Sequence, residues 1–314
     1  MASASLNADE ILARQALTPG QVAWKRFRRH RMALVGIWIL VGLMLYVTLG
    51  AFFFTEADAN LVDLRQKISA PSNGHPFGTD MAGRDILART IYGGQISIII
   101  GVLAVVVSVT VGVLIGATAG YFGGIIDSLL MRFTEAVFNI PQLFLLIVLA
   151  KFFASQTPNF TFLGRTYSGS VVIIVGVIGL TSWMYLARIV RSSFLSLKER
   201  EFVTAARATG AGDASIIFEH ILPSAMAPII VTATLEVANA ILSEAYISFL
   251  GMGVQPPTAT WGNMLNEAYS QLEIAPWMWF FPGTLILLIV LAINFVGDGL
   301  RDALDPQSLA GAQE

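Results

Sequence analysis

Long uncharged apolar runs alternate with polar segments along this chain, and the length of the runs sets the first prediction. A helix that crosses about 30 Å of hydrocarbon needs about 20 apolar residues at about 1.5 Å of rise per residue. Six runs reach that length, and we expect each to form a transmembrane helix. Their approximate bounds are 32–54, 96–120, 128–150, 170–187, 225–250 and 278–296.

Composition agrees with an all-α polytopic membrane protein. Hydrophobic residues make up 55% and charged residues 13% of the 314 residues, which is outside the range of soluble domains. The chain has no cysteine, which excludes disulfides and thiolate metal sites, and we expect neither a metal site nor a catalytic residue. Because the first run is too long for the core of a signal peptide, we expect it to be a retained anchor, with the mature chain beginning near Met1.

The distribution of Lys and Arg predicts that both ends of the chain lie in the cytoplasm. Basic residues favour cytoplasmic loops, and five of them stand in the eight residues WKRFRRHR before the first run. This cluster could instead bind anionic lipid or nucleic acid, but beside an anchor helix we favour the topological interpretation and expect no nucleic acid partner. With six spans, basic residues inside outnumber those outside by two to one. Those inside are Arg14, Lys25, Arg26, Arg28, Arg29, Arg31, Arg188, Arg191, Lys198, Arg200, Arg207 and Arg301.

This topology divides the chain into five parts. They are a cytoplasmic N-terminal segment (1–31), a first transmembrane anchor helix (32–54), an extracytoplasmic loop (55–95), a core membrane domain with five spans (96–296) and a cytoplasmic C-terminal tail (297–314). The core domain contains a polar cytoplasmic segment at 199–223.

The segment 199–223 is too charged to cross a membrane. Each of its six charged residues would cost about 2.5–3.5 kcal/mol at the centre of a bilayer. Its apolar residues nevertheless recur at helical spacing, which predicts two short helices. Gly210 suits the left-handed position after a helix, Asp213 suits the N-cap of the second helix, and Pro223 suits its end.

This hairpin has two interpretations. It could be an amphipathic surface element that covers the ends of neighbouring spans, or it could be a docking element. Ala205, Ala206, Ala208 and Gly210 leave one side of the first helix almost free of bulk, which would let the groove of a partner approach its backbone. A hairpin that continues through Pro223 into the next span would transmit a push into the membrane.

The motifs of this hairpin resemble the EAA loop of importer permeases of the ATP-binding-cassette class. In AARATG and the later HILP, five residues match the family pattern, while Thr204 stands where the family has Glu and His220 has the form of the dipeptide and oligopeptide branch. Glu201 lies one helical turn from Thr204. The resemblance implies an ATPase-coupling site made of Glu201, Thr204, Ala205, Ala206, Arg207, Gly210, Asp213, His220, Leu222 and Pro223.

The resemblance covers nearly the whole chain and extends to function. HPFGTDMAGRDILARTIYGG, GYFGGIIDSLLMR, ISFLGMGVQPPTATWGNML and GDGLRDALDP are similar to the second permease subunit of oligopeptide and dipeptide importers. It implies a subunit of the bacterial cytoplasmic membrane that forms half of a peptide pathway. The implied partners are a second homologous permease in a heterodimer, two ATPase subunits, an extracytoplasmic peptide-binding protein and membrane lipid. Nickel, glutathione and other small solutes stay open as alternative cargo.

The nucleotide is expected on the partners and not on this chain. A phosphate-binding P-loop needs Lys directly after Gly, and none of the four lysines follows a glycine. We therefore expect no bound cofactor, with ATP and magnesium held by the ATPase subunits, and a non-catalytic role for this subunit.

Polar residues inside the fifth predicted span are candidates for the translocation path. Glu236, Asn239, Ser243 and Glu244 fall on one helical face, together with Ala240. Such a stripe would suit the ammonium group and amides of a peptide, since ionisable residues within a membrane are often functional. The alternative is that these groups bind neighbouring helices or the partner permease.

Other features favour structural roles. Arg132 and Glu135 in the third span are expected to form an ion pair, and Pro141 to kink that span. Gly112, Gly116 and Gly120 have the spacing of closely packed helices. In the 55–95 loop, Asp80 and Arg84 are spaced for an ion pair, and the loop could be a lid, a docking site for the binding protein or a folded spacer. The segment 251–277 predicts an interfacial helix anchored by Trp261 and Trp277.

Two other classes of function are less compatible with the sequence. An intramembrane enzyme would need catalytic groups in the spans, but His30, His75 and His220 all lie outside them, and neither H-E-x-x-H nor G-x-S-x-G occurs. An ion-driven secondary transporter also uses polar groups at the midplane and is often built from repeats. No repeat is evident between the halves of this chain, and such a carrier does not need a cytoplasmic docking hairpin.

Overall fold

The apolar runs form long helices in the computed structural model, which describes residues 19–153, 158–162 and 165–305. The parts of the expected terminal segments before residue 19 and after residue 305 lie outside the described residues. Five helices are long and apolar enough to cross a membrane, and a bent pair provides a sixth crossing if it counts as one span. The five are α3 (Arg31–Phe53), α5 (Ile86–Phe122), α8 (Ser170–Leu197), α12 (Met226–Phe249) and α14 (Trp277–Leu304). The prediction of an all-α polytopic membrane protein is confirmed.

Short elements connect the long helices. A two-stranded antiparallel sheet, β1 (Phe160–Phe162) and β2 (Arg165–Tyr167), precedes α8, and Phe160 pairs with Tyr167 in it. The helical connections are α2 (Pro19–Phe27), α4 (Glu56–Asn60), the 3-10 turn Leu64–Gln66, α9 (Glu201–Ala208), α10 (Asp213–Ser215), α11 (Leu222–Ser224) and α13 (Trp261–Tyr269).

Several helices extend beyond the apolar runs that predict them. Helix α5 begins at Ile86 and not near 96, because Asp85 caps it by accepting a hydrogen bond from the Ala88 N–H at 2.8 Å. Residues 86–95, which were expected to belong to the extracytoplasmic loop, are therefore the first part of α5. Helices α8 and α14 continue to Leu197 and Leu304, past the expected 187 and 296. A helix satisfies its own backbone groups, so it can run beyond the hydrocarbon into water.

The third predicted span is broken, and the expectation of one kinked helix was wrong. Helix α6 (Gly124–Phe138) and helix α7 (Gln142–Phe153) meet at an angle of 84°. The break falls at Asn139–Pro141, where Pro141 has no N–H to continue the helical ladder. A proline alone kinks a helix, and the much larger bend here lets α7 pack against α8 and α12.

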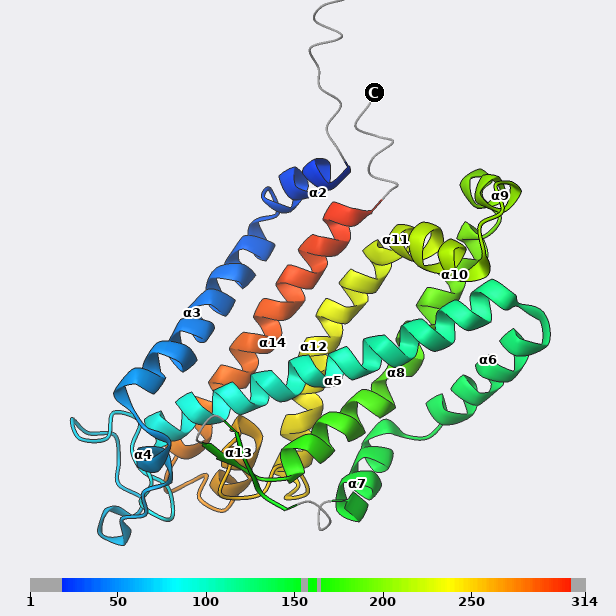
Figure 1. Ribbon diagram of the computed structural model, residues 1–314. Coiled ribbons are helices and arrows are strands. Elements are labelled where there is room, and N and C mark those ends of the chain that lie inside the picture. Colours follow the sequence, from blue (N-terminus) through cyan, green and yellow to red (C-terminus); the bar gives the residue numbers. More distant parts are fainter. Residues whose placement is uncertain (1–18, 154–157, 163–164, 306–314) are drawn as a thin grey trace, which may run out of the picture.

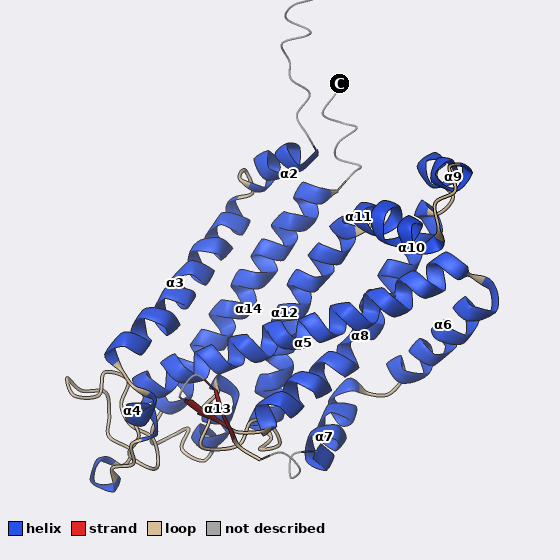
Figure 2. Cartoon of the chain, in the orientation of Figure 1, coloured by secondary structure: helices blue, strands red, loops and turns tan. Residues whose placement is uncertain are grey.

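The two ends of the helix bundle carry different elements. Helices α2 and α9 and the last turn of α14 lie at one end, while α4, α13 and the small sheet lie at the other (Figures 1 and 2). The hairpin of α9 to α11 and both described ends of the chain therefore share one side of the bundle, as the expected topology requires.

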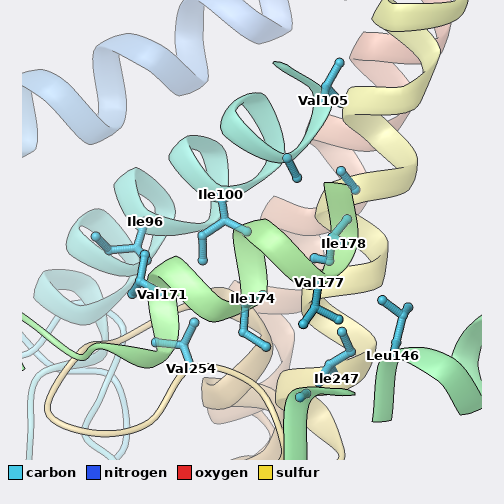
Figure 3. Packing of buried hydrophobic residues seen from close by; sticks show 13 residues of the cluster. Ile96, Ile100, Val105, Leu146, Val171, Ile174, Val177, Ile178, Ile247 and Val254 are labelled. Atoms are coloured by element: carbon cyan, nitrogen blue, oxygen red, sulfur yellow. The ribbon is translucent and has the colours of Figure 1, made fainter. Parts of the chain in front are cut away.

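Helices α5 and α8 pack closely along their length, and the small-residue stripe of α5 faces α8. A Cβ atom at Gly112 would lie 3.0 Å from the Trp183 carbonyl oxygen, and one at Gly120 would lie 2.6 Å from Phe194 Cβ. This confirms the structural role expected for these glycines. Further along, Ile100, Ile174 and Ile178 form a core with residues of α7 and α12 (Figure 3).

Candidate functional site

The segment 199–223 forms the expected hairpin, and its turn has the predicted geometry. Gly210 has a φ of +87°, and it follows Thr209, the C-cap residue of α9. The Gly210 N–H donates to the Arg207 carbonyl and the Ala211 N–H donates to the Ala206 carbonyl, each at 3.0 Å. These two bonds are the Schellman motif, which satisfies the last carbonyl groups of a helix.

The second half of the hairpin differs from the expected helix that ends at Pro223. Gly212 takes the N-cap position, so Asp213 is the first helical residue. Residues Ile216–Ile221 form a π-helix, in which the Leu222 N–H reaches the Ile217 carbonyl. Pro223 lies within α11, and the chain passes through Ala225 directly into α12. The wider π turn fits Pro223, because this residue has no N–H for the preceding turn and its ring would crowd a regular one.

The inner face of the hairpin is anchored to the bundle by apolar packing. Val203, Ile216 and Ile221 are fully buried or almost so, and they pack in one cluster with Phe194 of α8. Burial of such side chains contributes about 1.5–3 kcal/mol each. The hairpin is therefore packed against the ends of the long helices and forms part of the folded bundle.

Tyr121 at the end of α5 provides a polar anchor for the same hairpin. Its hydroxyl donates a hydrogen bond to Asp213 Oδ1 at 2.5 Å, and the Arg207 guanidinium lies 5.7 Å from the centre of its ring. Tyr121 therefore contacts both halves of the hairpin, Arg207 through its ring and Asp213 through its hydroxyl group. Sequence reasoning missed Tyr121, because nothing in its local pattern connects it to residues about ninety positions later.

The exposed face of the hairpin is smaller than the sequence indicates. Ala206 is 9% exposed and packs inward, so it does not belong to the bulk-free outer side that was expected. Leu222 also packs against the inner cluster. The predicted coupling residues that remain exposed are Glu201, Thr204, Ala205, Arg207, Gly210, Asp213 and Pro223, while His220 is half-buried.

An ion pair near the hairpin end joins α6 to α8, and the sequence did not predict it. Arg191 donates from Nε to Asp127 Oδ1 at 2.5 Å and from Nη2 to Asp127 Oδ2 at 2.6 Å. The expected ion pair between Arg132 and Glu135 is absent from the described structure, where both side chains are exposed. Asp127 stands in the first turn of α6, where a negative charge is favourable.

The predicted polar face of α12 divides into two environments. Glu236 is 9% exposed and accepts one hydrogen bond, from the Ser108 hydroxyl of α5 at 2.9 Å. It lines a cavity of about 270 Å³ at the break between α6 and α7, and also a groove of about 760 Å³ between α8, α12 and α14. Asn239 is exposed and lines the same groove, and Ser243 is half-buried.

Glu244, in contrast, is fully buried and holds together two hydrogen-bonded relays. The backbone N–H of Trp261 donates to Ser97 Oγ, and the Ser97 hydroxyl donates to Glu244 Oε2 at 3.1 Å. On the other side, the Val254 N–H donates to Ser248 Oγ, and the Ser248 hydroxyl donates to Glu244 Oε1 at 2.7 Å. The carboxyl group thus ties the segment between α12 and α13 to the bundle, which favours the structural alternative for this residue.

The two tryptophans expected as interfacial anchors both hydrogen-bond within the protein, and Trp261 is fully buried. Trp261 is fully buried at the start of α13, and its indole N–H donates to the Thr90 carbonyl at 2.8 Å. The Trp277 indole donates to the Thr79 carbonyl at 3.2 Å and is half-buried. The prediction of an interfacial anchor was wrong for Trp261, because its fully buried ring packs among other segments of the protein.

The ion pair between Asp80 and Arg84 is confirmed, and it belongs to a larger network. Arg84 Nε lies 2.6 Å from Asp80 Oδ2, and its Nη2 lies 2.6 Å from Glu267 Oε2 of α13. Arg89 of α5 also reaches Glu267, at 3.3 Å. This network links the segment before α5 to α13. The segment is therefore folded against the end of the bundle that lies opposite α9.

Two family models match this chain. Residues 112–308 match the family model described as binding-protein-dependent transport system inner membrane component. Residues 18–71 match the model of the N-terminal transmembrane domain of oligopeptide transport permease C.

Curated relatives cover almost the whole chain. A protein of Brucella suis named as a peptide permease is 45% identical over 90% of this chain and 89% of its own length. The oligopeptide transport system permease protein OppC of Escherichia coli is 39% identical over 96% of this chain and 95% of its own. OppC of Bacillus subtilis is 38% identical over 98% and 95%.

Proposed function

Because the chain belongs to the family of inner membrane components of binding-protein-dependent transport systems, we propose that it is one permease subunit of an ATP-driven importer of oligopeptides. The support for peptide cargo is the identity to peptide permeases over nearly the full length of the chain. In this proposal the subunit is non-catalytic and binds no cofactor, and ATP and magnesium are held by two ATPase subunits. A second homologous permease completes the pathway, and an extracytoplasmic peptide-binding protein delivers the cargo.

The observation that carries the proposal is the anchored hairpin with an exposed α9. The exposed residues of α9 are Glu201, Phe202, Thr204, Ala205, Arg207 and Ala208. They combine the small side chains of Ala205 and Ala208 with the larger apolar and charged ones of Phe202 and Arg207. Such a surface suits the groove of a partner helix or domain. Its inner face is fixed to α5 and α8 through Tyr121 and the cluster around Phe194.

A push on α9 has a direct route into the membrane. The hairpin continues through α10, the π-helix and α11 into α12 without an intervening loop. Movement of the ATPase subunits would therefore reach the groove that Glu236 and Asn239 line, about 10 residues or roughly 15 Å down α12. Coupling of this kind requires two packed arrangements of the bundle, between which the ATPase biases the equilibrium.

The test is a bulky substitution on the exposed face of α9. Ala205→Leu keeps a good helix former and changes an exposed side chain, so the hairpin should fold. We expect the complex that carries Ala205→Leu to lose most of its co-purifying ATPase and most of its ATP-driven uptake of a labelled oligopeptide. This substitution is cleaner than one at Gly210, where the positive φ would strain any other side chain.

The matched control is Ala57→Leu, at an exposed alanine in α4 at the opposite end of the bundle. It should leave ATPase association unchanged. Normal ATPase association and uptake in Ala205→Leu would contradict the docking role. Uptake of nickel or glutathione in place of peptide by the wild-type complex would overturn the cargo and leave the coupling role standing.

A further inference from the structure

The break between α6 and α7 borders a cavity whose lining mixes polar and apolar side chains. The cavity of about 270 Å³ is lined by the non-helical residues Asn139–Pro141 and by polar side chains of three other helices. Non-helical backbone at membrane depth is tolerated where it is buried in protein or lines a water-filled space. The lining side chains with polar atoms are Asn139, Gln142, Thr181, Ser182, Tyr185 and Glu236, and the apolar ones include Phe138, Leu145 and Met184.

Glu236 is the acidic group of this cavity, and it has little compensation from its own chain. The Ser108 hydroxyl donates the hydrogen bond that it accepts, at 2.9 Å. Among the described residues, no Lys, Arg or His nitrogen lies within 4.0 Å of its carboxyl oxygens. A buried acidic group without a cationic partner is costly, which makes it a candidate for binding a cation that arrives from outside.

The position of Glu236 also joins this cavity to the hairpin end of the bundle. Glu236 and Tyr185 line both the cavity and the groove of about 760 Å³. The groove runs along α8, α12 and α14 to Arg301 near the last turn of α14. A solute at Glu236 would therefore stand between a polar break on one side and an open route toward the hairpin end on the other.

From this geometry we propose that Glu236, together with Gln142 and Ser182, forms a transient site for the α-ammonium group of a peptide. The inference rests on the proposed function, and it adds which chemical group of the cargo is recognised and where. The Gln142 amide and the Ser182 hydroxyl, 3.4 Å apart, offer donors and acceptors to the first peptide group. Since a single acidic group faces the ammonium, the site can bind it without trapping it.

The experiment compares two peptides and two variants in the complete complex, reconstituted with its binding protein. One labelled peptide has a free amino terminus, and the other is the same peptide with an acetylated amino terminus, each loaded to saturation on the binding protein. Glu236→Gln keeps an acceptor for Ser108 and removes the charge. We expect it to lower uptake of the free-amine peptide about tenfold and to leave uptake of the acetylated peptide unchanged.

Glu236→Asp keeps the charge and should retain uptake of the free-amine peptide within about twofold. Glu273→Gln, at an exposed residue outside the cavity, should change neither peptide. An equal loss for both peptides would overturn the ammonium site in favour of a purely structural role, and so would unchanged uptake of the free-amine peptide in Glu236→Gln. Absence of peptide uptake by the wild-type complex would be a failure of the proposed function itself.

Discussion

Glu236 and Glu244 are the same residue type on the same helix, two turns apart, and their surroundings differ in the number of donors and in the space around them. Glu244 is fully buried, accepts from Ser97 and Ser248, and closes two relays that begin at backbone N–H groups. Glu236 accepts from Ser108 and borders two open spaces. Burial alone therefore does not separate a structural acidic residue from a functional one.

The difference follows from how a protein compensates a polar group in a low-dielectric interior. A carboxyl group that is supplied with donors from two sides is satisfied by the fold, and any change to it disturbs the fold. A carboxyl group with one donor and an adjoining polar cavity leaves acceptor capacity for a solute. The comparison predicts that substitutions at Glu244 affect stability and substitutions at Glu236 affect transport.

The largest expected effect on stability is that of Glu244→Ala. The substitution leaves the hydroxyl groups of Ser97 and Ser248 without their acceptor and opens a cavity, and each buried unpaired donor costs about 1–3 kcal/mol. Thermal unfolding of the purified permease pair should show a large fall in midpoint, accompanied by a low yield. The control is Glu236→Ala, which removes the acceptor of Ser108 beside a cavity where water can replace it, so its midpoint should fall much less than that of Glu244→Ala. A Glu244→Ala protein as stable as the wild type would contradict the structural role of Glu244.

A smaller loss is expected for Trp261→Phe, which tests the indole hydrogen bond of the residue whose backbone N–H begins one relay. The substitution removes the indole hydrogen bond to Thr90, for a net loss of about 0.5–1.5 kcal/mol, and leaves a small gap where the larger ring packed. The backbone N–H of residue 261 still reaches Ser97, so the relay to Glu244 persists. Thermal unfolding measures the loss, with the more exposed Trp279→Phe as control. Equal shifts in the two variants would show that the buried bond adds nothing.

The hydrophobic pattern predicted five of the long helices and their order, because lipid requires a long apolar helix wherever the chain crosses. It did not predict their ends. Asp85 caps α5 well before the apolar run begins, and a residue that suits a cap does not reveal by itself which helix it starts. The bend at Pro141 was foreseen only as a kink, since its size depends on the packing of α7 against other helices.

The candidate sites divide in the same way between local and distant causes. The turn at Gly210 was predictable, because the left-handed position after a helix is a local requirement. The burial of Ala206 was not, since it depends on helices that are distant in the sequence. For Glu244, the partner Ser248 is visible one turn away, whereas Ser97 comes from α5 and only the fold brings it there. Pattern alone therefore placed both acidic residues on one face and could not tell them apart.

The smallest expected effect is that of Ser108→Ala, which tests whether water reaches the carboxyl group of Glu236. Ser108→Ala removes the donor to Glu236, and water in the adjoining cavity can replace it, so we expect a loss of at most about 0.5 kcal/mol. Ser97→Ala is the matched control, because the same change there interrupts a relay between Trp261 and the fully buried Glu244, where about 1–3 kcal/mol is at stake. The two variants are compared by their thermal unfolding midpoints under the same conditions. Equal destabilisation would mean that water reaches the carboxyl group of Glu236 no more than that of Glu244. The adjoining cavity could then not hold a charged solute.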